Sequence, residues 1–131
     1  MSKDILRLKG INKAYNRGLD GEVTVLKGLD LAIAPAQVVA LVAPSGAGKS
    51  TLLHIAGLLD TADSGQLEID GVNMCGLDGK ARTVLRRQDI GFIYQFHHLL
   101  PEFSALENIV IPQLANNVAP AQARDYAMDL L

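Results

Sequence analysis

A glycine-rich loop carries the residues of this chain that could do chemistry on a phosphate. It consists of Ala43, Pro44, Ser45, Gly46, Ala47, Gly48, Lys49, Ser50 and Thr51. Gly46 and Gly48 allow backbone conformations in which successive N–H groups point at one anion. Lys49 adds a mobile positive charge, and the Ser50 hydroxyl is suited to bind a magnesium ion beside the phosphates. The loop therefore predicts a site for a nucleoside triphosphate with Mg²⁺, in which Thr51 makes a further phosphate contact.

An apolar strand and an apolar helix are expected to position this loop. Residues 38–42 are apolar without alternation and end before Pro44, which is typical of a buried strand in a parallel sheet. The helix that follows has apolar residues on more than one side, so we expect it to pack against the sheet. Its N-terminus would add unpaired N–H groups and the positive end of the helix dipole. A glycine-rich turn can contain Gly-Lys-Ser by chance, but this setting favours nucleotide binding.

The composition agrees with one cytosolic domain that has a hydrophobic core. The chain has 131 residues, of which 49% are hydrophobic and 20% charged, and its net charge is −2. That charge gives no electrostatic argument for binding nucleic acid or an anionic membrane. The single cysteine, Cys75, cannot form an internal disulfide, which suits a reducing compartment. Because no apolar run is long enough to span a bilayer and residues 1–10 lack the apolar segment of a signal peptide, we expect any membrane association to depend on a partner.

The remaining elements are predicted from hydrophobic periodicity and turn residues. Alternating apolar residues predict strands around Leu6 and Leu8 and at 29–33, with a loop at 16–21 between them. Further along the chain we expect a polar turn at 60–65, a strand at 66–70, a hairpin turn at Asp70-Gly71, a solvated basic helix at 80–87 and a strand at 89–94.

Two helices are expected in the C-terminal third of the chain. Ser104 and Glu107 have the spacing of a capping box, which predicts a helix from there to about Ile111. Pro112 should interrupt this helix, because proline has no N–H to donate. Pro120 should open a second helix. The apolar face of that helix holds Ala123, Ala127, Leu130 and Leu131.

Three segments in this order resemble the ATP-binding subunits of ABC transporters. They are the loop at 43–51, SGQLEIDG at 64–71 and RRQDIGFIYQFHHLLPEFSALENIVIP at 86–112. Within that superfamily the last segment is most similar to lipoprotein-releasing ATPases of the LolD type, close to the macrolide-export and cell-division branches. The resemblance implies an α/β fold with a P-loop NTPase core. Residues 1–95 would form an antiparallel β subdomain and the ATP-binding core, and 96–131 the Q-loop and the start of a helical subdomain.

The same resemblance implies roles for residues outside the loop. Tyr15 would stack on the adenine of ATP, although a tyrosine at a strand end can also be a packing residue. Gln95 matches the Q-loop glutamine, whose amide would reach the magnesium ion that Ser50 binds. The segment from Phe96 to Glu107 would contact the transmembrane subunits. Its candidate anchors are Phe96, Leu99, Leu100 and Phe103. The adjacent His97 and His98 are better suited to polar contacts there than to a metal.

The sequence departs from the family's pattern at two places. Ala43 replaces the usual first glycine of the loop, which is acceptable if Ala43 avoids a left-handed conformation. Ala36-Gln37 stands where the family more often has Gly-Glu.

Several family motifs do not occur in the 131 residues. The sequence has no LSGGQ-like signature, no apolar strand ending in an Asp-Glu pair and no switch histidine after it. We therefore expect the N-terminal portion of a longer ATPase, with no catalytic residue in this part. Alone, the chain should expose sheet edges and apolar surface and should not hydrolyse ATP at a useful rate.

For the full-length family member the resemblance implies ATP hydrolysis at the cytoplasmic face of the inner membrane. Two copies would enclose two ATP molecules and drive a membrane complex that releases lipoproteins. One alternative is the ATPase of another exporter or of a cell-division complex. Another is a nucleotide-binding module that does not hydrolyse ATP. A small P-loop kinase would leave Gln95 and its flanking residues unexplained.

Overall fold

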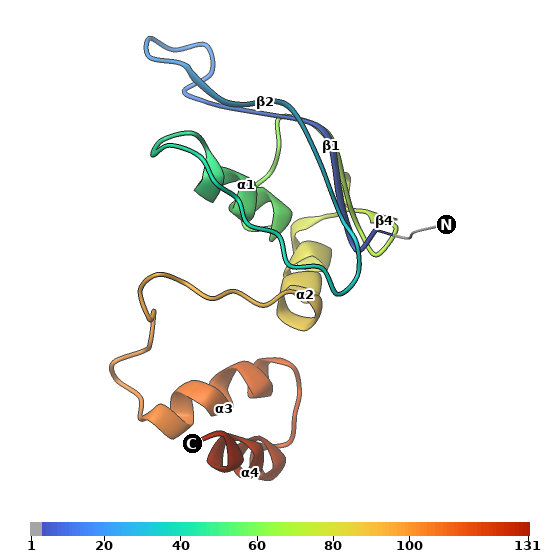
Figure 1. Ribbon diagram of the computed structural model, residues 1–131. Helices are drawn as coiled ribbons and strands as arrows, with labels where there is room; N and C mark the ends of the chain where they lie inside the picture. The colour runs from blue at the N-terminus through green and yellow to red at the C-terminus, as the bar shows by residue number, and fades with distance from the viewer. Residues whose placement is uncertain (1–3) are drawn as a thin grey trace. The chain divides into compact units, whose positions relative to one another are not determined.

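The computed structural model describes residues 4–131, which divide into two compact units. We call Met1–Thr83 the N-terminal unit and Val84–Leu131 the C-terminal unit. In chain order the elements are β1 Leu6–Tyr15, β2 Val23–Ile33, α1 Lys49–Ala56, β3 Ser64–Ile69, β4 Val72–Asn73, α2 Gly79–Asp89, α3 Ala105–Ala115 and α4 Pro120–Leu130 (Figure 1). Sheet and helices together confirm the predicted α/β class.

An antiparallel sheet forms most of the N-terminal unit. Its strand order is β2-β1-β3-β4, so β1 pairs on both sides. Leu8 is paired with Leu31 of β2 and with Leu67 of β3. The strands predicted around 6–8, at 29–33 and at 66–70 are confirmed. The hairpin turn between β3 and β4 is also confirmed, and Asp70 and Gly71 have the positive φ angles of 48° and 76° that such a tight turn requires.

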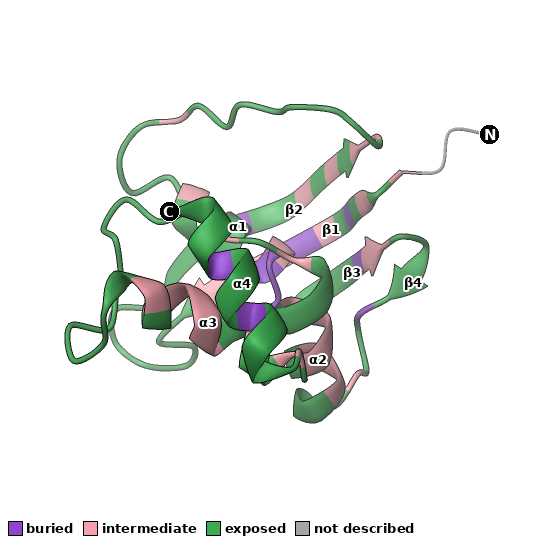
Figure 2. Cartoon of the chain, turned by 90° about the horizontal axis from the view of Figure 1, so that it is seen from below, coloured by how far each residue is buried: buried purple, intermediate pink, exposed green. Residues whose placement is uncertain are grey.

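The hydrophobic core of the N-terminal unit lies between this sheet and α1. Figure 2 shows buried residues along β1, where the inward side chains of Leu8 and Ile11 are 1% and 0% exposed. Leu52 and Ile55 are the buried residues of α1, as expected for a helix that packs on a sheet. His54, on the opposite side of the helix, is exposed.

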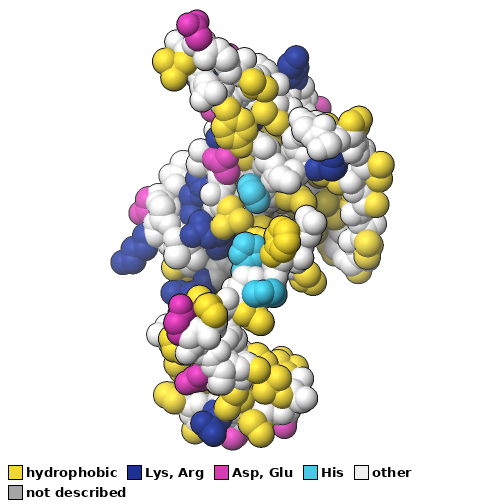
Figure 3. Space-filling view, turned by 90° about the vertical axis from the view of Figure 1, so that its left-hand side faces the viewer, with side chains coloured by type: hydrophobic (Ala, Val, Ile, Leu, Met, Phe, Trp, Pro, Cys, Tyr) yellow, Lys and Arg dark blue, Asp and Glu magenta, His cyan; other side chains and the backbone are white. Residues whose placement is uncertain are grey.

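Two predicted strands are wrong in the part of the chain that the structure describes. Residues 38–42 and 90–94 are irregular, and Asp89 belongs to α2. Val38 and Val42 are 98% and 90% exposed, and Ile93 is fully exposed. A strand needs a neighbour for its N–H and C=O groups, and the described sheet includes neither segment. On the face drawn in Figure 3, hydrophobic side chains, in yellow, reach the surface at many places.

Helices α3 and α4 form the C-terminal unit together with the segment before them (Figure 1). The predicted capping box is present, because the Ser104 side chain accepts from the Glu107 N–H and Glu107 accepts from the Ser104 N–H. The prediction that Pro112 ends α3 is wrong, since the helix continues to Ala115. Proline removes only one helical hydrogen bond there, to the carbonyl of Asn108, and the helix accommodates that loss.

The second helix begins at Pro120, as predicted. The Gln113 side chain joins the two helices, because its Nε2 donates to the carbonyls of Ile109 and Ala123 at 3.0 and 3.1 Å. Of the predicted apolar face of α4, Ala123 and Ala127 are buried, whereas Leu130 and Leu131 are 58% and 68% exposed. Among residues 4–131, no helix has the length and apolar character needed to cross a bilayer.

Candidate nucleotide-binding site

The loop before α1 is closed by the side chain of Lys49. The Lys49 Nζ donates to the carbonyl oxygens of Ala43 and Pro44 at 2.7 and 2.8 Å. The Ala47 N–H also donates to the Pro44 carbonyl, at 3.2 Å. An ammonium group has three N–H donors, so Lys49 keeps one for a ligand. Ala43 is not among the described residues with positive φ, which is the condition under which alanine is acceptable at this position.

Two glycines give the loop its shape. Gly46 and Gly48 have φ angles of 79° and 96°, in the region that side chains other than glycine rarely adopt. Gly48 is the N-cap of α1, and no side chain of the described residues caps this end of the helix. The first N–H groups of α1 are therefore left for another acceptor, and the positive end of the helix dipole lies beside them.

These groups surround a pocket of about 380 Å³. It is lined by Val25, Ser45, Gly46, Gly48, Lys49, Ser50 and Thr51. Uncapped helix N–H groups, an ammonium group and hydroxyl groups form a donor set that fits a polyphosphate. The Ser50 hydroxyl at the first turn of α1 fits a hard cation such as Mg²⁺, which prefers oxygen ligands.

Tyr15 lies beside the first turn of α1. Its hydroxyl is 3.2 Å from Oγ1 of Thr51 and 3.4 Å from Oδ2 of Asp60. The structure thus brings two predicted site residues, Tyr15 and Thr51, together. The tyrosine is 41% exposed at the end of β1, so its ring is accessible. Whether it stacks on adenine stays a prediction.

Lys13 and Asp60 are residues of this site that sequence reasoning missed. Lys13 Nζ donates to Oδ1 of Asp60 at 2.9 Å and to the carbonyl of Thr61 at 2.8 Å. Burial alone would raise the pKa of Asp60. However, that pKa is lowered below its usual 3.8 by hydrogen bonds from Lys13 and from the Thr61 N–H. The charge of Lys13 and the hydrogen bond from the Tyr15 hydroxyl lower it further. The sequence carried no signal for Lys13, because simple alternation places it on the exposed face of Arg7 and Lys9, and the register shift between Leu8 and Ile11 brings it to the buried face.

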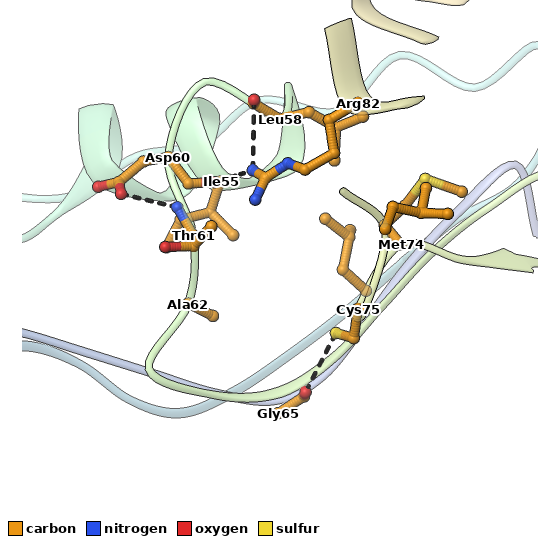
Figure 4. Close-up of a pocket in the computed structure, with 12 residues that line it drawn as sticks. Ile55, Leu58, Asp60, Thr61, Ala62, Gly65, Met74, Cys75 and Arg82 are labelled. Carbon is orange, nitrogen blue, oxygen red and sulfur yellow. Dashed lines mark hydrogen bonds between the residues drawn. The ribbon is translucent and has the colours of Figure 1, made fainter. Parts of the chain in front are cut away.

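Asp60 also lines a smaller cavity of about 200 Å³ (Figure 4). Its walls are mainly apolar and include Ile55, Leu58 and Met74. Arg82 reaches from α2 to the loop that follows α1, where its Nη2 donates to the carbonyls of Leu58 and Asp60 at 3.3 and 2.8 Å. Arg82 therefore fixes the backbone that carries the Asp60 carboxylate.

Gln95 and the segment that follows it belong to the C-terminal unit. Gln95 is exposed, and its role near a metal stays a prediction. The four candidate anchors of the partner surface are all exposed, by 44% to 72%. They are Phe96, Leu99, Leu100 and Phe103. The His97 side chain is engaged within the segment, because its Nδ1 accepts from the Leu99 N–H at 3.0 Å.

Asn108 holds part of this segment in place and was also missed from the sequence. Its Nδ2 donates to the carbonyls of Leu100, Phe103 and Ser104 at 3.1, 3.1 and 2.9 Å. Its Oδ1 accepts from the Leu100 N–H at 2.8 Å. An asparagine in the first turn of a predicted helix was the only sequence signal, and such a residue usually faces solvent.

Comparison with known proteins assigns the chain to a family. A family model described as ABC transporter matches residues 26–130. The lipoprotein-releasing system ATP-binding protein LolD of Roseobacter denitrificans is 64% identical over 131 residues, which are 100% of this chain and 58% of that protein. LolD of Maricaulis maris is 53% identical over 131 residues, covering 100% of this chain and 57% of that protein. The chain thus spans a little over half the length of these curated relatives.

Solved structures agree with the sequence comparison. The dimeric structure of the ATP-binding cassette MJ0796 in a post-hydrolysis state, bound to ADP and Pi, matches with a TM-score of 0.85 and 34% identity. The match covers 95% of this chain and 54% of that one. This likeness confirms the predicted fold of an ABC ATPase. The chain therefore belongs to the ABC transporter family, and over its whole length it is similar to the ATP-binding protein LolD.

Proposed function

We propose that this chain is the nucleotide-binding part of an ATPase that powers the release of lipoproteins from the inner membrane. The observation that carries the proposal is the phosphate loop at the uncapped N-terminus of α1, in a chain 64% identical to a LolD protein. The groups of the loop are suited to bind a nucleotide. The similarity to LolD is the reason for proposing lipoproteins as the cargo.

Different groups would bind the phosphates, the adenine and the metal ion of Mg-ATP. The loop N–H groups and Lys49 would bind the phosphates, and Tyr15 would stack on the adenine. Ser50 and Gln95 would bind Mg²⁺, whose charge would neutralise the phosphate oxygens. Hydrolysis is proposed for the full-length protein, because the relatives are longer than this chain and phosphoryl transfer needs charged groups placed around the γ-phosphate. We expect residues 1–131 alone to bind ATP without useful turnover.

Two kinds of protein partner follow from this function. A second copy of the ATPase would complete each nucleotide site, as the dimeric state of MJ0796 suggests. Transmembrane subunits would dock on the segment from Phe96 to Glu107, where exposed apolar side chains are available. The protein would then act as a peripheral subunit at the cytoplasmic face of the inner membrane, without contact to nucleic acid.

The thermal unfolding midpoint of the purified full-length protein, with and without Mg-ATP, tests nucleotide binding. A ligand at about a hundred times its dissociation constant stabilises a native site by roughly 2.7 kcal/mol. We expect this stabilisation in the wild type and in Lys27→Ala, which removes an exposed lysine of β2 outside the loop. It should be lost in Lys49→Ala. Equal stabilisation of both variants would contradict a site at this loop.

The cargo is tested in cells that depend on the full-length protein. With Lys49→Ala as the only copy, lipoproteins should accumulate in the inner membrane. Their normal sorting, together with a defect in drug export or in division, would favour the alternative exporter or cell-division ATPase. ATP binding without turnover by the full-length protein would instead favour a nucleotide-binding module.

A further inference from the structure

Lys13 is a buried cation whose partners lie in the loop that follows α1. The side chain is 8% exposed, and its Nζ makes hydrogen bonds of 2.9 Å to Oδ1 of Asp60 and 2.8 Å to the Thr61 carbonyl. A buried ammonium group is tolerated only when such partners compensate for the lost water. Lys13 and Asp60 are therefore fixed relative to each other and to β1.

The second carboxylate oxygen of Asp60 extends this arrangement to Tyr15. An ionised carboxylate only accepts hydrogen bonds, so the Tyr15 O–H points at Oδ2 of Asp60 across 3.4 Å. The tyrosine oxygen is then free to accept from the Thr51 hydroxyl, 3.2 Å away. The hydrogen bonds thus run in one direction, from Thr51 to Tyr15 to Asp60, and Lys13 donates to the other carboxylate oxygen, Oδ1.

Lys13 also acts directly on the tyrosine ring. Its Nζ lies over the ring, 5.3 Å from the centroid, which is within the range of a cation–π interaction. One face of the ring is therefore occupied by the ammonium group. A nucleotide base would stack on the opposite face.

We infer that Asp60 and Lys13 are positioning residues that hold the Tyr15 ring for a nucleotide base. This inference rests on the proposed nucleotide site and adds its base-recognition element. Asp60 fixes the hydroxyl end of Tyr15, and Lys13 covers one face of its ring. Arg82 in turn fixes Asp60 by donating to its carbonyl at 2.8 Å. Because Tyr15 is also joined to Thr51 in the first turn of α1, the base and the phosphates are bound by one connected group of residues.

A purely structural role for the same ion pair makes a different prediction. If Lys13 and Asp60 only stabilised the fold, their loss would weaken every ligand of the site equally. If they position Tyr15, their loss would weaken only ligands that carry a base. Inorganic triphosphate has the phosphates of ATP but no base, so the two ligands separate the two roles.

The experiment measures dissociation constants of ATP and inorganic triphosphate, each with Mg²⁺, for the full-length protein. We expect Asp60→Asn to raise the dissociation constant of ATP about fivefold, the equivalent of one lost hydrogen bond. The dissociation constant of triphosphate should stay within about twofold of the wild-type value. Tyr15→Phe keeps the ring and removes only the hydroxyl, and it should give the same pattern. The double variant should bind ATP no more weakly than either single variant, because both changes break the same hydrogen bond between Tyr15 and Asp60.

Asp30→Asn is the matched control. It removes a carboxylate that accepts from the Gly10 N–H at 2.6 Å in the same sheet, away from Tyr15. This variant should bind both ligands like the wild type. If Asp60→Asn does not fold, the dissociation constants of Tyr15→Phe test the positioning role alone. This variant should fold, because the Tyr15 side chain is already 41% exposed. Equal losses for ATP and triphosphate, or none, would overturn the positioning role, whereas a wild type that binds neither ligand would overturn the nucleotide site itself.

Discussion

Gly48 lies so close to Val25 that a Cβ on the glycine would be 2.5 Å from Cγ1 of the valine. The carbonyl of Val25 and Cδ2 of Leu26 would each be 3.2 Å away. The last glycine of the phosphate loop is therefore required for two reasons, its φ of 96° and its contact with β2. The contact sets how closely the start of α1 approaches the sheet.

Alanine at Gly48 should destabilise the protein more than alanine at Gly46. Both positions have positive φ, which costs alanine about 1–2 kcal/mol. At Gly46 a Cβ would meet no described atom within 4 Å, so Gly46→Ala should cost only this amount. Gly48→Ala also overpacks the contact with β2, which adds about 1–3 kcal/mol. Urea unfolding of the full-length variants measures both costs.

Val25→Ala supplies the control for this clash. Without the valine Cγ1, the added methyl of Gly48→Ala loses its closest neighbour. The cost of Gly48→Ala should therefore be smaller in a Val25→Ala background and approach that of Gly46→Ala. The same cost in both backgrounds would show that the backbone angle alone makes Gly48 necessary.

The loop itself could be predicted from the sequence, because its chemistry depends on neighbouring residues at fixed spacing. The approach of Gly48 to Val25 could not, because it joins residues that are distant in the chain. The same holds for Lys13 and Asp60, which are separated by 47 residues. A lysine in an alternating strand predicts a solvated side chain, and only the fold shows that this one faces the loop after α1.

Glycine at Ala36 should stabilise the protein. Ala36 has a φ of 59°, a left-handed conformation that is strained for alanine. This angle gives a physical reason for the glycine that the resemblance leads us to expect here. Relief of about 1–2 kcal/mol of strain, less the entropy that glycine loses on folding, leaves a gain of about 1 kcal/mol.

The matched control is Ala32→Gly in β2, opposite Arg7. Ala32 is not among the described residues with positive φ, so its replacement should destabilise by about 0.5–1 kcal/mol. Urea unfolding should therefore give opposite signs for the two alanines. A loss of stability in Ala36→Gly would contradict the strained conformation.

The strands show where sequence patterns are sufficient and where they are not. Alternation predicted the start of β1 and residues 29–33 of β2, because each has one face toward the core and pairs with a strand of the N-terminal unit. Residues 38–42 have the composition of a buried strand but no strand beside them among the described residues. Composition predicts that such a segment can be buried, whereas strand formation depends on a neighbour.

The contribution of Asp60 to stability should depend on pH. The pKa of this carboxyl is below its usual 3.8 in the folded protein, despite the opposing effect of burial, because of the hydrogen bonds from Lys13 and Thr61. The ionised form is therefore the one that stabilises the fold. Its contribution to stability is complete above pH 3.8, the usual pKa, and is lost as the pH falls through the lowered pKa of the folded protein.

Thermal unfolding of wild type and Asp60→Asn from neutral pH to below 3.8 measures this dependence. The wild type should be the more stable protein at neutral pH, and the difference in midpoint should shrink as the acid form appears. A difference that stays constant with pH would contradict a stabilising role for the ionised carboxylate.

Asn108 should determine the order of the segment proposed to meet the transmembrane subunits. Its side chain accepts from the Leu100 N–H at 2.8 Å and donates to the carbonyls of Leu100, Phe103 and Ser104. Asn108→Ala removes all of these hydrogen bonds. Because one net hydrogen bond contributes about 1 kcal/mol, the Leu100 amide should exchange its hydrogen at least about fivefold faster.

Hydrogen–deuterium exchange of Leu100 in the full-length protein is the measurement, with Asn108→Asp as the graded control. Aspartate keeps an oxygen for the Leu100 N–H but loses the donors to the three carbonyls. Its Leu100 amide should therefore remain more protected than in Asn108→Ala. Unchanged exchange in Asn108→Ala would mean that the backbone holds the segment without this side chain. Faster exchange together with weaker binding to the transmembrane subunits would show that the exposed anchors Leu100 and Phe103 must be ordered before they can dock.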